Sequence, residues 1–109
     1  MEELAYKIKS DFLRVLAHPL RLQIIELLKR QEEKVGGIAK GLNIPQSSLS
    51  RHLLALREAG ILKSRQQGTV IYYAIEDKGI FRVLRPIAEM LRKKLEKTAT
   101  VLTSLGKEK

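Results

Sequence analysis

The sequence predicts a mainly α-helical fold of the α+β class that carries one small β-hairpin. Apolar residues recur three and four positions apart along most of the chain, which is the spacing of amphipathic helices. After Gly60 the period changes from 3.6 to 2, and two runs rich in strand-forming residues flank Gly68. The expected order of elements is α-α-α-α-β-β-α, in a single domain of residues 1–109.

The composition limits the functions open to the chain. Its 109 residues carry a formal net charge of +9, which favours polyanionic partners, nucleic acid first and an anionic membrane second. There is no cysteine, so disulfides, thiolate metal sites and thiol redox switches are excluded. No apolar run approaches the roughly 20 residues that span a bilayer, and the first residues do not form a secretory signal. We therefore expect a cytoplasmic protein that does not enter a membrane.

Two helices are predicted at the start of the chain. The first covers about residues 3–16, where apolar residues recur at helical spacing: Leu4, Ile8 and Phe12. It should end before Pro19, because a residue that precedes proline is disfavoured in the helical conformation. The second helix restarts with Pro19 and is apolar nearly all round, as expected at the centre of a core. The charged residues 29–34 that follow are expected to form a surface loop, and His18 to belong to the turn between the two helices.

A helix-turn-helix is predicted over about residues 35–58. Residues 35–42 have the pattern of a short helix. Asn43 tolerates the left-handed backbone conformation that ends one helix and lets the next begin in a new direction. Pro45 disfavours helix at the residue before it, so the second helix should start near Gln46. One face of that helix is polar and partly cationic, and the other is an apolar stripe of Leu49, Leu53 and Leu56. The alternative is an ordinary helical hairpin in an unrelated core.

A β-hairpin is expected over about residues 62–75, with Gly68 at its turn. The residues near its tip are basic, amide-bearing or hydroxylic: Arg65, Gln66, Gln67 and Thr69. Side chains of these kinds can reach backbone phosphates or a minor groove. A hairpin of this composition, directly after a helix that presents serine and arginine, is typical of a wing beside a recognition helix on DNA.

A long last helix is predicted from residue 78 to residue 105, with Asp77 as its N-cap. A seam with spacings of three and four runs along it, beside Ile87: Leu84, Ala88, Leu91, Leu95, Thr98, Leu102 and Leu105. This stripe is longer than so small a domain can cover, so we infer a homodimer. The alternative is a helix packed entirely on its own domain. Pro86 fits the first turns of the helix or marks a kink, and residues 106–109 are expected to fray.

The order of these elements, with particular segments, resembles the ArsR/SmtB family of bacterial and archaeal winged helix-turn-helix repressors. The likeness covers about residues 4–100 and is carried by residues 16–28 (LAHPLRLQIIELL), 46–53 (QSSLSRHL), 56–60 (LREAG) and 70–73 (VIYY). It implies a homodimeric repressor, built on the first and last helices, that occludes a palindromic operator in double-stranded DNA. It implies DNA contacts on the recognition helix at Gln46, Ser47, Ser48, Ser50, Arg51 and His52. The expected dimer contacts are Leu4, Ile8, Phe12, Leu84, Ile87, Leu91, Leu95 and Leu102.

Four positions of the helix-turn-helix have individual expectations. Arg51 is the strongest candidate, because a guanidinium can make a bidentate contact with guanine or clamp a phosphate. His52 lies near the apolar stripe, so a half-buried structural histidine is supported as well as a phosphate contact. Leu54 projects from the polar face, where relatives more often have a small or charged residue, and either touches a thymine methyl or packs beneath the wing. Pro45 stands where relatives often have a hydroxyl N-cap, which leaves capping to Asn43 or water.

The metal sites known in the family are missing from this sequence. Many relatives sense metals through cysteines in the third helix, but the corresponding residues here are Lys34 and Gly36. Others bind zinc or nickel between two copies of the last helix, yet residues 78–109 contain no histidine. We therefore expect no metal and no cofactor, and the small-molecule effector stays unassigned.

Other functions compete with sequence-specific binding. An enzyme is rejected, because Ser48 and His52, although one helical turn apart, lack a carboxylate to orient them. The main alternative is an architectural winged-helix protein that covers DNA without sequence choice, and binding of RNA is another. The predicted recognition helix presents glutamine and serine, which contribute hydrogen bonds to base edges more than charge. The major groove of duplex RNA is too narrow for such a helix. We therefore predict a sequence-specific DNA-binding regulator of transcription.

Overall fold

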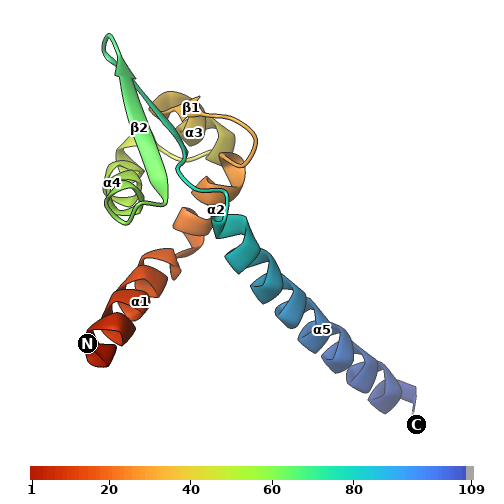
Figure 1. Ribbon diagram of the computed structural model, residues 1–109. Helices are drawn as coiled ribbons and strands as arrows, with labels where there is room; N and C mark the ends of the chain where they lie inside the picture. The colour runs from red at the N-terminus through yellow and green to blue at the C-terminus, as the bar shows by residue number, and fades with distance from the viewer. Residues whose placement is uncertain (108–109) are drawn as a thin grey trace. The chain divides into compact units, whose positions relative to one another are not determined.

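The computed structural model describes residues 1–107 (Figure 1). In order, it contains α1 (Glu2–Leu16), α2 (Pro19–Leu27), β1 (Glu33–Lys34), α3 (Val35–Leu42), the 3₁₀ helix η1 (Gln46–Ser48), α4 (Ser50–Glu58), β2 (Leu62–Gln67), β3 (Val70–Ile75) and α5 (Ile80–Lys107). The chain divides into two compact units, one from Met1 to Asp77 and one from Lys78 onward. The predicted class, mainly helical with a small wing sheet, is confirmed. None of the described helices combines the length and the apolar character needed to cross a bilayer.

The sheet of the first unit contains one strand more than the sequence predicted. Within the charged segment expected to be a loop, Glu33 pairs with Tyr73 and Lys34 pairs with Tyr72. The strand order is β1-β3-β2, with antiparallel pairing throughout. Two residues are too few to show an alternating pattern, so the sequence gives no signal for β1.

The core of the first unit is built from α2, α3, α4 and the sheet. The apolar stripe of α4 is buried as predicted, since Leu49, Leu53 and Leu56 expose at most 1% of their surface. Ile24 of α2 is also fully buried, and α2 packs against both α3 and α4. The other side of α2 is open at Leu22, so this helix is not buried all round as its composition indicated. This packing fixes α4 with its polar face toward solvent.

Three residues end or start helices where the sequence predicted. α1 ends at Leu16, and His18 caps α2, because its Nδ1 accepts a hydrogen bond from the Leu20 N–H at 3.2 Å. Pro19 occupies the first position of α2. Asn43 follows α3 with φ 57° and ψ 48°, which is the left-handed conformation expected at the turn.

The recognition helix starts later than predicted. Residues 46–48 form the 3₁₀ helix η1, and α4 begins only at Ser50. Pro45 is extended, with ψ 142°, and the amides of residues 48 and 49 donate to carbonyls three positions earlier. Among the described residues, no side chain caps η1 or α4, so Asn43 does not supply the missing cap. The tighter 3₁₀ bonding satisfies these first amides in place of a cap.

The second unit consists of α5. A turn closed by hydrogen bonds between residues three apart precedes it, so the helix begins at Ile80 and not at residue 78. Pro86 lies inside α5, where it has no N–H to donate to the carbonyl of residue 82. The helix continues through Lys107, beyond the predicted end. Of the tail that was expected to fray, residues 108 and 109 lie outside the described residues.

Candidate nucleic-acid interface

A polar surface formed by η1 and the first turn of α4 carries most of the predicted DNA contacts. It comprises Gln46, Ser47, Ser48, Ser50 and Arg51, all of them exposed, and we call it the recognition surface. Among the described residues, none of these five side chains has a hydrogen-bond or ion-pair partner. The surface offers a guanidinium, three hydroxyls and an amide, which are groups that bind phosphates and base edges.

Leu54 extends the recognition surface by one turn of α4. Its side chain is 42% exposed. Residues three apart on a helix are neighbours on its surface, so Leu54 follows Arg51 along the same face. The exposed part of Leu54 is available to a thymine methyl, and the covered part is compatible with packing beneath the wing, so both roles considered for Leu54 agree with this exposure.

His52 is a correction to the predicted DNA contacts, because its side chain is buried and only 3% exposed. Its Nδ1 accepts a hydrogen bond from Nε of Arg21 at 3.1 Å, and its ring centre lies 4.4 Å from that of His18. Arg21 also donates to the Val15 carbonyl at 3.2 Å. These contacts connect α4 to the end of α1 and the start of α2. His52 therefore holds the recognition helix in place and is not available to DNA.

The stability of the protein is expected to fall on mild acidification because of His52. Burial lowers the pKa of this histidine below its ordinary value, and the charges of His18, Arg21 and Arg51 act in the same direction. In the unfolded chain His52 takes up a proton near pH 6.5, whereas the folded state resists protonation until the lower pKa is reached. The unfolded state then binds more protons, so the free energy of unfolding declines as the pH falls below about 6.5.

Urea denaturation across this pH range measures the decline. His52→Gln keeps an acceptor for Arg21 but does not titrate, so its free energy of unfolding should depend less on pH. His18→Asn keeps an acceptor at the N-cap of α2 and should retain the decline, because burial is the main cause of the shift at His52. An equal decline in His52→Gln and in the wild type would show that another group is responsible.

The wing consists of β2, β3 and the two-residue turn between them. Gly68 has a φ of +63° and Thr69 has a negative φ, which is the pattern of a type II′ hairpin turn. Nε2 of Gln66 donates to the Gly68 carbonyl at 3.1 Å and stabilises this turn. A 3.2 Å hydrogen bond from Arg57 to Oγ of Ser64 connects α4 to the wing. The predicted contact residues around the turn are exposed: Gln66, Gln67 and Thr69.

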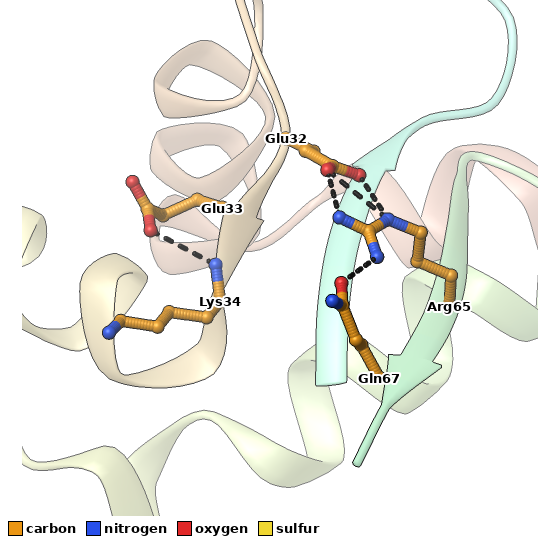
Figure 2. Close-up of polar contacts among 5 residues, drawn as sticks. All are labelled: Glu32, Glu33, Lys34, Arg65 and Gln67. Carbon is orange, nitrogen blue, oxygen red and sulfur yellow. Dashed lines mark hydrogen bonds and ion pairs between the residues drawn. The ribbon is translucent and has the colours of Figure 1, made fainter. Parts of the chain in front are cut away.

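Arg65 is engaged within the protein (Figure 2). Its Nε and Nη2 donate to the carboxylate of Glu32, and its Nη1 donates to Oε1 of Gln67 at 2.9 Å. The guanidinium carbon also lies 4.2 Å from the centre of the Tyr72 ring. The hydrogen bonds between Arg65 and Glu32 lower the pKa of the carboxyl and raise the pKa of the guanidinium. Arg65, which the sequence predicted as a DNA contact near the wing tip, is thus held by other residues of the protein.

Sequence reasoning missed Glu32, the residue that holds Arg65. The two residues are 33 positions apart, and no spacing rule connects residues at that distance. Their proximity follows from the sheet, in which Tyr72 of β3 lies opposite both Lys34 of β1 and Arg65 of β2. Next to Glu32, the Glu33 carboxylate accepts the Lys34 N–H at 3.0 Å, directly before α3 (Figure 2).

The two histidines of the chain both make contacts within the protein. Among residues 1–107, no three histidines or carboxylates are grouped closely enough to hold a metal ion. Each of the two histidines uses Nδ1 as an acceptor, His18 from the Leu20 N–H and His52 from Arg21. Both rings therefore contribute to helix packing.

The residues predicted to make a dimer lie on α1 and α5, each described here by itself. On α1, Leu4 and Ile8 are more than half exposed and Phe12 is 36% exposed. Ile8 and Phe12 also line an apolar groove of about 390 Å³ between α1 and α4. On α5, Leu84 is half-buried, and the other predicted residues are 41% to 67% exposed: Ile87, Leu91, Leu95 and Leu102.

Comparison with known sequences finds regulatory proteins. A family model described as bacterial regulatory protein, arsR family, matches residues 18–64, from the cap of α2 into β2. The uncharacterized HTH-type transcriptional regulator Rv0081 of Mycobacterium tuberculosis is 34% identical over 101 residues, 92% of this chain and 89% of that protein. The transcriptional repressor PagR of Bacillus anthracis is 37% identical over 91 residues, 80% of this chain and 91% of PagR.

Solved structures of similar proteins share the fold. The crystal structure of Mycobacterium tuberculosis Rv0081 matches with a TM-score of 0.77 and 32% identity, covering 87% of this chain and 96% of that one. A solution structure of Mb0332 from Mycobacterium bovis matches with a TM-score of 0.76 and 27% identity, covering 88% and 89%. That structure is described as the homodimeric winged helix-turn-helix DNA-binding domain of a possible ArsR-family transcriptional regulator.

Proposed function

Because the chain belongs to the arsR family of bacterial regulatory proteins, we propose that it is a homodimeric repressor that binds a palindromic operator in double-stranded DNA. The family is one of regulators, so the chain is a transcriptional regulator and not an enzyme. The observation that carries the proposal is the recognition surface, which is exposed and has no partner among the described residues. In this proposal residues 1–109 act as one winged helix-turn-helix domain in the cytoplasm.

The chemistry of the recognition surface supports sequence-specific binding over architectural binding. Only Arg51 is a cation there, whereas a protein that held DNA by charge alone would need cations along the phosphate backbone. Arg51 can donate to O6 and N7 of one guanine, and Gln46 can pair with the edge of an adenine. Leu54, one turn further along α4, suits contact with a thymine methyl. Together these groups distinguish base pairs in the major groove.

A two-fold dimer gives the proposed repressor its geometry. Extended apolar surface is uncommon on monomers, so the exposed apolar residues of α1 and α5 support a second copy as their cover. The homodimeric description of Mb0332 supports the same assembly. Two-fold symmetry would place the two recognition helices in successive major grooves about 34 Å apart. A dimer bound across a promoter then represses by occlusion, and no metal or other effector is part of this proposal.

Selection of bound duplexes from a random DNA library, at near-physiological salt, tests the function. We expect an inverted repeat whose half-sites lie about one helical turn apart. Duplex RNA of the same length serves as competitor and should not displace the selected DNA. Recovery of no motif, with an affinity that collapses as salt rises, would contradict sequence-specific binding and favour the architectural alternative.

A further inference from the structure

We propose that Glu32 and Arg65 form a positioning pair that presents the amide N–H₂ of Gln67 to the minor groove and gives the wing a preference for A·T base pairs. The inference rests on the proposed binding to duplex DNA, but it concerns the wing alone. In it, Arg65 acts on DNA through Gln67 and not as a phosphate contact.

The guanidinium of Arg65 is held from three sides. Glu32 accepts hydrogen bonds from Nε and Nη2, the two-point geometry that fixes a guanidinium most strictly. The Tyr72 ring lies against the guanidinium, with its centre 4.2 Å from the guanidinium carbon. Gln67 accepts from the remaining nitrogen, Nη1, at 2.9 Å. All three nitrogens thus donate to groups of the protein itself, and Arg65 has a defined position before DNA binds.

The orientation of the Gln67 amide follows from the position of Arg65. Arginine donates hydrogen bonds and accepts none, so Gln67 must turn its oxygen toward Arg65. Its nitrogen then faces away from the guanidinium, as Figure 2 shows. No described residue accepts a hydrogen bond from that nitrogen. Gln67 therefore carries two oriented and unused N–H donors at the exposed end of β2.

The tip of the wing suits base edges better than phosphates. Residues 66–69 are Gln-Gln-Gly-Thr and carry no charge, and the charge of Arg65 is balanced by Glu32. In the minor groove, an A·T pair presents only acceptors, adenine N3 and thymine O2. A G·C pair adds the guanine N2 amino group, which is a donor. Donors fixed on Gln67 therefore match A·T pairs and are opposed by guanine.

The test measures binding to the selected operator with its flanking base pairs, where the wings lie, changed from A·T to G·C and then to inosine·C. Inosine lacks the 2-amino group, so an inosine·C pair combines the major groove of G·C with the minor-groove acceptors of A·T. For the wild type, G·C flanks should weaken binding about three- to tenfold, the effect of one hydrogen bond. Inosine·C flanks should restore it.

Three variants separate positioning from a general loss of contacts. Glu32→Gln removes the charge and one of the two acceptor oxygens, so Arg65 is no longer fixed at two points. The flank preference should then disappear while the affinity for every flank is kept or rises. Gln67→Glu still accepts from Arg65 but has no N–H, so it should also lose the preference. Lys40→Gln is the control, because it removes an exposed cation of α3, outside the wing and the positioning pair, and should weaken all flanks equally.

The outcomes distinguish failure of the positioning pair from failure of the proposed repressor function. Equal binding of all flanks by the wild type, or a flank preference retained in Glu32→Gln, would overturn the positioning pair and leave the repressor function standing. Inosine·C flanks that bind as weakly as G·C flanks would place the discrimination in the major groove and overturn it too. Recovery of no operator at all would overturn the proposed function, and this inference with it.

Discussion

Leu95→Glu is expected to convert the proposed dimer to a monomer and to lower operator affinity by more than about 100-fold. Leu95 is 67% exposed on α5, in line with Leu91 and Leu102, which are also more than half exposed. Burial of one leucine contributes about 1.5–3 kcal/mol, so the two copies lose about 3–6 kcal/mol, and the buried carboxylates add to the loss. Light scattering measures the mass, and fluorescence anisotropy with labelled operator measures the binding.

Lys93→Glu is the control for this experiment. Lys93 lies two residues from Leu95, and therefore on the other side of α5. It adds a carboxylate to the same helix without touching the apolar stripe, so this variant should remain dimeric. If Leu95→Glu also stays dimeric and binds the operator normally, the two copies associate through another surface.

Arg51→Ala is expected to weaken operator binding by about 1–3 kcal/mol and to flatten sequence preference. The side chain is exposed and has no partner among the described residues, so its loss should leave the melting temperature unchanged. The effect arises because a bidentate contact to one base contributes only at the correct sequence. Anisotropy titrations against the operator and a scrambled duplex give the comparison.

Lys40→Ala provides the contrast, since it removes an exposed cation from α3 and leaves the recognition surface intact. It should weaken the operator and the scrambled duplex by similar factors, with a smaller dependence on salt. If Arg51→Ala binds both duplexes with the affinity of the wild type, Arg51 is not one of the DNA contacts.

Signals that act through a residue's own backbone were sufficient to locate several helix ends. Proline and left-handed asparagine restrict the backbone locally. As predicted, α1 ends shortly before Pro19, α2 begins at Pro19, and α3 ends just before Asn43. The buried stripe of α4 also follows from spacing, because Leu49, Leu53 and Leu56 share one face whatever the rest of the chain does. These local rules were enough to predict the helix-turn-helix and its exposed polar face.

Features that depend on distant partners were not accessible to the sequence. The burial of His52 depends on Arg21 of α2, and the engagement of Arg65 depends on Glu32, which lies 33 residues earlier. Both side chains have the chemistry of DNA contacts, and only the tertiary structure shows that they are used internally. The 3₁₀ start of the recognition helix was missed for a related reason, since Pro45 is compatible with either type of helix.

β1 and β2, the two edge strands of the three-stranded sheet, resist hydrogen bonding to the sheet of another molecule. β1 is only two residues long, and both of them, Glu33 and Lys34, are charged. On the opposite edge, β2 carries Lys63 and Arg65. Short or charged edge strands resist the edge-to-edge pairing by which sheets extend into aggregates. In the proposed dimer, sheet edges of this kind would favour association of two copies through their helices over pairing of their sheets.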